Sequence, residues 1–318
     1  MKDNILLGSQ LAKFFGKEKG LITYSGTLAI ELALANLLSK GNVLVSNRVC
    51  YSIINTIIKL GLKPIIVCPR NGLYFENNEI EKIVEKEKID CILLVHQYGY
   101  FNEINSIKEK YPNIKIIEDV AQSWIVQTKE QPIGKYSDIV VTSFGKTKPL
   151  SYGIGGGLFY NDDVDIDNID YCDNDSRLNE KITYAYLYPQ CNSIDIKELI
   201  SIGNDNVLNQ QNNSKKYYQF LKKYSFIKNY YVGKNSSYHR YVILIENNDK
   251  YKRLVELLKK SKIEYQLLHS VYLEDLPICK SEKKLNIKNN CNNYVFLRTR
   301  NIDIDNQINE LKEILKRV

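Results

Sequence analysis

Residues 143–157 read SFGKTKPLSYGIGGG, a serine and a phenylalanine followed by two lysines and a cluster of glycines. A Walker A phosphate loop needs a glycine five residues before Gly145-Lys146-Thr147, and that position is Val140. A dinucleotide-binding fingerprint would stand in the first strand–helix unit, far upstream of this stretch. The segment is therefore either a plain glycine-rich turn or the seat of a reactive lysine, because a partly desolvated lysine is a competent amine nucleophile.

The first half of the chain alternates between short apolar runs and helical patterns. The runs are rich in β-branched residues and lie at 43–46, 64–68, 91–96, 114–119, 138–144 and 156–160. The helical patterns between them start at Leu28, Cys50 and Asn78. Continuous apolar strands that alternate with helices indicate an α/β fold with a mostly parallel sheet covered on both faces. The pattern from Leu28 is apolar almost all round, so we expect a buried helix there.

The character of the sequence changes after residue 163. The next stretch is polar, rich in Asp and Asn, and weakly periodic. Helical patterns and short strands follow it, at 206–224, 241–245, 251–260, 263–268, 294–298 and 308–318. This order predicts a large α/β domain over 1–163, a connecting, substrate-side segment over 164–205 and a small α+β domain over 206–318.

Two further stretches carry candidate polar groups. Ser25-Gly26-Thr27 precedes the first helical pattern, and hydroxyls with free N–H groups at a helix start bind phosphate well, although the same residues also make an ordinary helix cap. Glu118 and Asp119 in IIEDVAQS end an apolar strand, at the sheet edge where α/β proteins bind ligands, although solvated loop acids would look the same. Each of these two stretches is a weak signal alone. Their occurrence together with the lysine segment, in a fixed order along one sheet, is specific.

Together, the three stretches resemble the DegT/DnrJ/EryC1/StrS family of pyridoxal-phosphate-dependent sugar aminotransferases. The family's SGT-x-A-L phrase reads SGTLAI here, its EDxAQ phrase reads EDVAQ, and its SFxxTK-x(4)-GxGG phrase reads SFGKTKPLSYGIGG. The likeness covers most of the chain and is densest from Leu21 to Asp162. It implies the fold type I of pyridoxal-phosphate enzymes, which is aspartate-aminotransferase-like, and a homodimer with shared active sites.

The resemblance also implies roles for individual residues. Lys148, rather than Lys146, would carry the pyridoxal phosphate covalently. Ser143, Thr27 and the backbone of Gly26 would hold the phosphate group of the cofactor. These expectations come from matching the family's phrases to this sequence, position by position.

The remaining expected cofactor contacts include one departure from the family. Asp119 would pair with the protonated pyridine nitrogen, Gln122 would lie alongside the ring, and Asn192 would reach the phosphate of the neighbouring subunit. Where the family places an aromatic residue that stacks on the ring, this chain has Cys50, with Tyr51 beside it. Either a thiol contact replaces the stack, or Tyr51 covers the ring.

Two more departures concern the glycine phrase and the connection after it. An acid is common inside the family's glycine phrase, and this chain has Ile154 there. The segment over 163–205 is abbreviated, and family members use that region around the substrate. The resemblance therefore specifies the cofactor more closely than the substrate.

Composition argues against several other classes of protein, namely nucleic-acid-binding, metal-binding, secreted and membrane proteins. The 318 residues carry a net charge of +7, spread without a basic stripe, so we expect no nucleic-acid partner and are left with compositional drift or an anionic substrate. Seven scattered cysteines and three separated histidines predict free thiols and no metal site. The start of the sequence lacks a signal-peptide pattern, and no stretch approaches about 18 apolar residues. We expect a cytoplasmic protein without a membrane segment.

The function that the resemblance implies is a transamination in two half-reactions. An amino-acid donor, glutamate in our interpretation, gives up its amino group, and a nucleotide-linked keto-sugar accepts it in surface polysaccharide or glycan biosynthesis. One alternative is a relative with another reaction, such as sugar dehydration, but dehydratases of this kind replace the cofactor lysine, so Lys148 argues against it. The other is a catalytically silent regulatory or scaffold protein, which the missing aromatic residue and the short connection favour.

Overall fold

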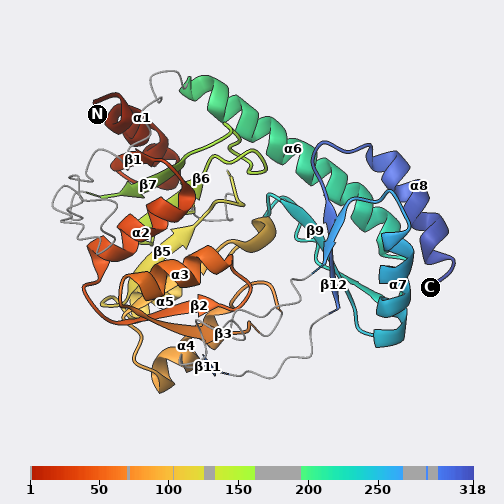
Figure 1. Ribbon diagram of the computed structural model, residues 1–318, viewed down its shortest axis with the longest axis horizontal. Helices are drawn as coiled ribbons and strands as arrows, with labels where there is room; N and C mark the ends of the chain where they lie inside the picture. The colour runs from red at the N-terminus through yellow and green to blue at the C-terminus, as the bar shows by residue number, and fades with distance from the viewer. Residues whose placement is uncertain are drawn as a thin grey trace.

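Two β-sheets organise the chain (Figure 1). The computed structural model describes residues 2–69, 72–102, 104–124, 133–161, 195–267, 284–285 and 293–318. The larger sheet has eight strands in the order β1-β7-β6-β5-β4-β2-β3-β11, and the smaller has four in the order β10-β12-β9-β8.

The larger sheet is mostly parallel, which confirms the predicted fold class. Its strands are β1 (Lys19–Thr23), β2 (Asn42–Ser46), β3 (Lys63–Val67), β4 (Cys91–Val95), β5 (Lys115–Asp119), β6 (Ile139–Ser143), β7 (Gly156–Tyr160) and β11 (Lys284–Leu285). Only β7 runs against its neighbours, β6 and β1. The connection from β6 to β7 over 144–155 contains no helix, and a parallel return would need a long crossover, so the chain turns back on itself.

Helices cover both faces of the larger sheet. They are α1 (Lys2–Ala12) with the short η1 (Lys13–Phe15), α2 (Gly26–Leu37), α3 (Tyr51–Lys59), α4 (Asn77–Lys86) and α5 (Asn105–Lys110). Alternate residues of each strand point to opposite faces: Val45 packs with α2 and α3, whereas Leu44 packs with α4 and α5. All residues from Leu28 to Leu34 of α2 are buried, as expected from their apolar pattern.

The smaller sheet is antiparallel and packs against helices on one face. It comprises β8 (Ile227–Asn229), β9 (Arg240–Ile245), β10 (Tyr265–Leu267) and β12 (Tyr294–Arg298), with helices α7 (Asn248–Lys259) and α8 (Ile304–Leu315). Its core joins Tyr241 and Ile243 of β9 to Leu254 of α7 and Leu311 of α8. The strands and helices predicted between residues 241 and 318 exist, with ends that differ by a few residues, whereas β8 was not predicted.

Helix α6 (Ile196–Leu221) crosses from the larger sheet to the smaller one (Figure 1). The sequence prediction placed its start near residue 206, inside what proved to be a continuous helix. Its first turns are apolar where they meet the large core: Leu199 is fully buried, and Gly203 lies against the indole of Trp124. The weak periodicity of this stretch hid a helix that packs through a few small and apolar side chains. No helix in the described part of the chain is long and apolar enough to cross a membrane.

Candidate active site

Asp119 and Ser143 end neighbouring strands of the larger sheet. Strands β5 and β6 pair in parallel with Asp119 opposite Val141, so Ser143 lies two residues further along β6 at the same edge. This is the carboxyl edge of the parallel strands, where α/β proteins bind ligands. The topology therefore places a carboxylate and a hydroxyl on either side of one site.

The start of α2 lies against Ser143. Ser25 caps this helix, because its Oγ accepts a hydrogen bond from the N–H of Leu28 at 3.1 Å. A Cβ on Gly26 would lie 2.8 Å from the Cβ of Ser143, so a residue without a side chain is needed for this close approach. Thr27 is exposed on the first turn, where N–H groups have no acceptor within the helix. Hydroxyls and N–H groups of two elements thus converge on one place that suits a phosphate.

The two lysines of the loop after β6 differ in their surroundings. Lys148 is half-buried, whereas Lys146 is exposed. A turn closed by the N–H of Lys148 and the carbonyl of Gly145, 2.8 Å apart, sets the direction of the Lys148 backbone. Burial raises the pKa of the Asp119 carboxyl group, and the positive charge of Lys148 offsets part of this rise, as expected for an amine on the same side of the sheet. Lys148 is the lysine that the loop directs toward the sheet edge.

Side chains from outside the larger sheet hold the carbonyls of the lysine loop. The Arg300 guanidinium donates one N–H to the carbonyl of Lys148 and another to that of Lys146, each at 2.8 Å. Asn206 of α6 donates from Nδ2 to the carbonyl of Pro149 at 2.8 Å. A planar guanidinium that binds two carbonyls has little freedom, so the backbone at Lys148 is fixed from the side of the smaller sheet.

Asp119 is a buried carboxylate that lacks an ion pair within the described part of the chain. Burial raises the pKa of its carboxyl group, whereas the N–H of Ala121, 2.9 Å from Oδ1, and the charges of Lys148 and His96 lower it in part. Burying an unpaired carboxylate is costly unless a cation or strong donor meets it. The position therefore suits a ligand that offers a positively charged N–H group.

Gln122 supports a strained turn beside the site. Its Oε1 accepts a hydrogen bond of 2.7 Å from the N–H of Tyr98 in η2 (Gln97–Gly99), and Tyr98 has a left-handed φ of 56°. The ring of Tyr98 stacks on Phe296 of β12 at 4.2 Å between centroids. The amide oxygen of Gln122 thus holds the turn through which the larger sheet contacts the smaller one.

Four other positions singled out in the sequence are at the surface or outside the described residues. Cys50 and Tyr51 are both exposed at the start of α3, and Tyr51 is 62% exposed. Ile154 is 47% exposed within the glycine phrase. The structure does not select between Cys50 and Tyr51 as the ring contact. Asn192 lies outside the described residues.

Sequence reasoning missed Arg300 and His239, two residues from the side of the smaller sheet that lie near the lysine loop. His239 precedes β9, and its pKa lies well below its ordinary value because it is buried and faces the charges of Arg240, Lys148 and Arg300. The stretch HRYVILIE was interpreted as a strand alone. The sequence did contain a signal for a functional role. A histidine and an arginine stand directly before the apolar run YVILI, where a charged side chain adds nothing to the packing of the strand.

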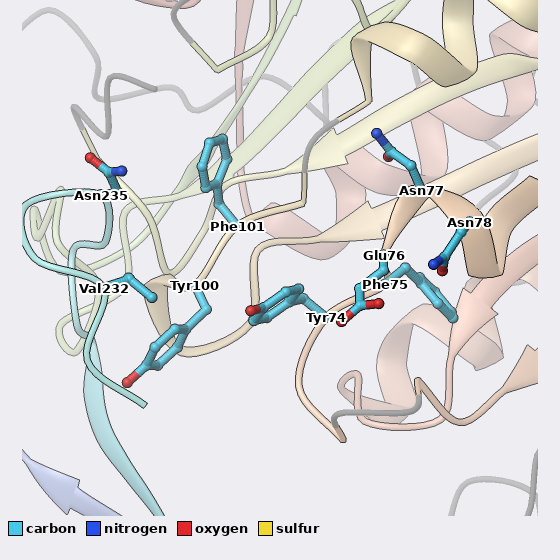
Figure 2. Close-up of a pocket in the computed structure, with 9 residues that line it drawn as sticks. All are labelled: Tyr74, Phe75, Glu76, Asn77, Asn78, Tyr100, Phe101, Val232 and Asn235. Carbon is cyan, nitrogen blue, oxygen red and sulfur yellow. The ribbon is translucent and has the colours of Figure 1, made fainter. Parts of the chain in front are cut away.

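A separate pocket of about 480 Å³ lies beyond η2, on the side of α4 (Figure 2). Figure 2 shows the rings of Tyr74, Tyr100 and Phe101 beside it, with Val232 and Asn235 on the side of the smaller sheet. None of the described candidate residues from the sequence lines this pocket. It is therefore distinct from the lysine site.

The comparison with known families agrees with the site geometry. The profile of the DegT/DnrJ/EryC1/StrS aminotransferase family matches residues 6–297, which is most of the chain. The chain belongs to this family. The family resemblance seen in the sequence is therefore confirmed. The large, mostly parallel sheet covered by helices agrees with the fold that this resemblance implied.

Curated members of the DegT/DnrJ/EryC1/StrS family align with part of the chain. The UDP-2-acetamido-2-deoxy-3-oxo-D-glucuronate aminotransferase of Pseudomonas aeruginosa is 31% identical over 49% of this chain and 45% of its own length. The GDP-perosamine synthase of Escherichia coli O157:H7 is 32% identical over 49% of this chain and 46% of its own length. The alignments thus span somewhat less than half of each relative.

Solved structures of the same fold cover nearly the whole chain. The GDP-4-keto-6-deoxy-D-mannose-3-dehydratase of E. coli, solved with bound hydrated pyridoxal phosphate, superposes with a TM-score of 0.76. The superposition covers 98% of this chain and 90% of that one at 18% identity. This likeness establishes the fold.

Proposed function

We propose that this protein is a pyridoxal-phosphate-dependent aminotransferase that moves an amino group from an amino acid, glutamate, to the keto group of a nucleotide-linked sugar. The observation that carries the proposal is the convergence of Asp119, Ser143 and Lys148 at one sheet edge, with Lys148 half-buried and Lys146 exposed. The family match gives this arrangement its chemical meaning.

The residues present fit the cofactor. Asp119 is a buried carboxylate in need of a cationic N–H, which a protonated pyridine nitrogen offers. The capped start of α2, where Gly26 lies against Ser143, offers N–H and hydroxyl groups that suit a phosphate, and Thr27 adds a hydroxyl. Lys148 supplies an amine between these two anchors. Gln122 and either Cys50 or Tyr51 would border the ring, and Asn192 would act on the phosphate of a second subunit.

Each of these side chains has a task that its position supports. When bound, pyridoxal phosphate supplies an electron sink that stabilises a carbanion on the substrate. Asp119 keeps a negative charge at the pyridine end of the site. Lys148 would hold the cofactor and, once released, would use Nζ to accept a proton from the donor carbon and return it to the product. Arg300 holds the Lys148 backbone so that Nζ moves from a fixed base.

The substrate class rests on the relatives. The names of those that match include aminotransferases acting on UDP-linked and dTDP-linked sugars and a GDP-perosamine synthase, which supports a nucleotide-linked keto-sugar and a place in polysaccharide biosynthesis. A sugar dehydratase on the same fold is the alternative, because one curated relative carries that name. The presence of Lys148 favours transamination over this alternative.

We further propose a homodimer that works in the cytoplasm. Tyr24 and Ile154 are 56% and 47% exposed, and a backbone bridge between Ser25 and Gly155 places them side by side next to the site. Exposed apolar residues grouped in this way are typical of an interface. The described cysteines are free thiols, which persist in a reducing compartment. A lysine in place of Ile154 should lower the dimer fraction measured by analytical ultracentrifugation, with Lys316→Glu, at the far C-terminus, as the charge-changing control.

A visible absorption spectrum tests the proposed chemistry. Purified protein mixed with pyridoxal phosphate should show the band of a cofactor joined to a lysine, and added glutamate should bleach it. The Lys148→Ala variant should lack the band, whereas Lys146→Ala should behave as wild type. A band that survives in Lys148→Ala would contradict the assignment. A band that forms in the wild type but is unaffected by amino acids would favour a catalytically silent relative.

A further inference from the structure

Two arginines stand directly opposite each other in the smaller sheet. Strands β9 and β12 pair antiparallel with Arg240 opposite Arg298 at the end of the ladder. Like charges in such a cross-strand pair repel, and the pairing is destabilising unless something compensates it. Burial and the neighbouring Arg298 guanidinium lower the pKa of Arg240, which agrees with a close approach of the two charges.

The arginine pair is on the sheet face that looks toward the larger sheet. Phe296, two residues before Arg298 on the same face, stacks on Tyr98 of η2, which belongs to the larger sheet's carboxyl edge. The opposite face of β9 packs on α6 through the stacked rings of Tyr241 and Tyr217. Both guanidinium groups therefore stand on the side of the lysine site rather than on the helix-covered side.

Arg300 joins the pair to the reactive lysine. Arg298 donates from Nε to the carbonyl of Arg300 at 3.0 Å, and Arg300 in turn binds the carbonyls of Lys148 and Lys146. The N–H groups of Arg300 are thus occupied by the lysine loop. Arg240, in contrast, donates to one carbonyl, that of His239, at 2.9 Å. A guanidinium has five N–H donors, so Arg240 and Arg298 both retain donors for a ligand.

Acidic side chains do not balance this charge. Within the described part of the chain, the carboxylate that pairs with the arginines is Glu264, which is half exposed and bound to Arg298. Burial and the charges of Arg240, Lys148 and Arg300 keep His239 neutral by lowering its pKa. Asp119 faces the charge of Lys148, but the three guanidinium groups of Arg240, Arg298 and Arg300 outnumber Glu264. A net positive charge therefore remains beside the site, which is costly until an anion enters.

We propose that Arg240 and Arg298 form a binding site for an oxyanion of the substrate, a carboxylate or phosphate group that lies next to the amine of Lys148. This inference rests on the proposed function, since it identifies which groups of this chain recognise a charged substrate there. Paired guanidinium groups suit such a ligand because they offer parallel N–H donors to two oxygens. The oxyanion can come from the carboxylate of the amino donor or from the diphosphate of the acceptor.

The test measures anion binding rather than turnover. Protein loaded with pyridoxal phosphate, so that the cofactor's own phosphate site is filled, is titrated by calorimetry with glutarate as the carboxylate probe and with inorganic pyrophosphate as the phosphate probe. The wild type should bind at least one of them. Arg240→Gln and Arg298→Gln should each weaken that binding about 10- to 100-fold, as expected for the loss of charged hydrogen bonds.

A matched control keeps the result specific. Arg253 of α7 is a surface arginine paired with Glu256 and far along the chain from the site, so Arg253→Gln makes the same change in net charge. It should bind both anions as the wild type does. Equal weakening in Arg253→Gln would show a general effect of net charge and would overturn the proposal.

The two probes distinguish the sources of the oxyanion. Selective loss of glutarate binding assigns the arginine pair to the donor carboxylate, and selective loss of pyrophosphate binding assigns it to the acceptor. Unchanged affinity for both probes in Arg240→Gln and Arg298→Gln would overturn the proposal, as would the absence of binding to the wild type. Failure of the aminotransferase proposal is seen separately, because the cofactor band reports on Lys148 and the titration reports on the arginines.

A stability measurement separates a ligand site from a structural role. Because Arg240 and Arg298 repel each other, Arg240→Gln without added anion should unfold at a temperature no lower than the wild type. The bound probe should raise the melting temperature of the wild type but not of Arg240→Gln. A marked loss of stability without anion would show that Arg240 is a structural residue and would contradict the proposal.

Discussion

The edges of the two sheets contribute opposite kinds of chemistry to the site. The carboxyl edge of the larger sheet provides a buried acid, hydroxyls and the lysine, in positions set by adjacent parallel strands. The edge of the smaller sheet provides guanidinium groups, one of which holds the carbonyls of the lysine loop. The difference teaches that the reactive groups and the groups that fix them belong to different parts of the fold, joined by α6 and Arg300.

The largest expected effect is at Asp119, on the larger sheet. Asp119→Asn removes the negative charge at the pyridine end of the site, and we expect transamination to fall about 10³-fold, the size of a lost electrostatic contact in an active site. The rate of bleaching of the cofactor band by glutamate measures this. Glu118→Gln changes the neighbouring acid on the opposite side of β5 and should reduce the rate far less.

The same substitution should have the opposite effect on stability. Burial raises the pKa of Asp119, so below the ordinary pKa of an aspartate the group is protonated in both states and has no effect, and stability is lost as the pH rises through the raised pKa. Cofactor-free Asp119→Asn should therefore unfold at a higher temperature than the wild type at neutral pH. Equal or lower stability of the variant would show that Asp119 is compensated within the protein.

The next largest effect tests the hydrogen bonds from Arg300, on the side of the smaller sheet, to the lysine loop. Arg300→Gln removes the fork that binds the Lys148 and Lys146 carbonyls, and a small displacement of a reacting group costs up to about 10²-fold in rate. We expect kcat to fall about 10- to 100-fold while the cofactor band still forms. Asn206→Ala removes the single bond to Pro149 and should have a smaller effect. An unchanged kcat in Arg300→Gln would mean that the larger sheet alone positions Lys148.

Helix α6, which connects the two regions, offers a test of packing. A Cβ on Gly203 would lie 2.4 Å from Nε1 of Trp124, so Gly203→Ala should destabilise the protein by about 1–3 kcal/mol through overpacking. Chemical denaturation of Gly203→Ala and of Ser201→Ala, an exposed position on the same helix, measures the difference. A stabilised Gly203→Ala variant would show that the helix shifts freely over the larger sheet.

The smallest expected effect is the pH dependence contributed by His239. Its pKa lies well below the ordinary value near 6.5, so the unfolded chain binds the proton more readily and stability is lost as the pH falls below that value. The groups that face it are Arg240, Lys148 and Arg300. His239→Asn should lessen the drop in melting temperature between neutral and mildly acidic pH. An identical pH profile would show that His239 does not titrate differently in the two states.

Much of the larger sheet could be predicted because its signals are local. Apolar runs bounded by turns located β2 to β7. The phrases EDVAQ and SFGKTK placed Asp119 and Ser143 at strand ends and Lys148 in the loop that follows β6. The start of α6 was missed because Leu199 and Gly203 pack by size rather than by an apolar stripe. Arg240 and Arg298 were missed because their pairing depends on the register of β9 with β12, which no local pattern reveals.

The covalent partner of the cofactor is the most direct test of this account. Protein loaded with pyridoxal phosphate is reduced with borohydride, which fixes the cofactor to its amine, and the labelled peptide is mapped by mass spectrometry. The account predicts the label on Lys148, the half-buried lysine held by Arg300. A label on Lys146 or on another lysine would contradict it.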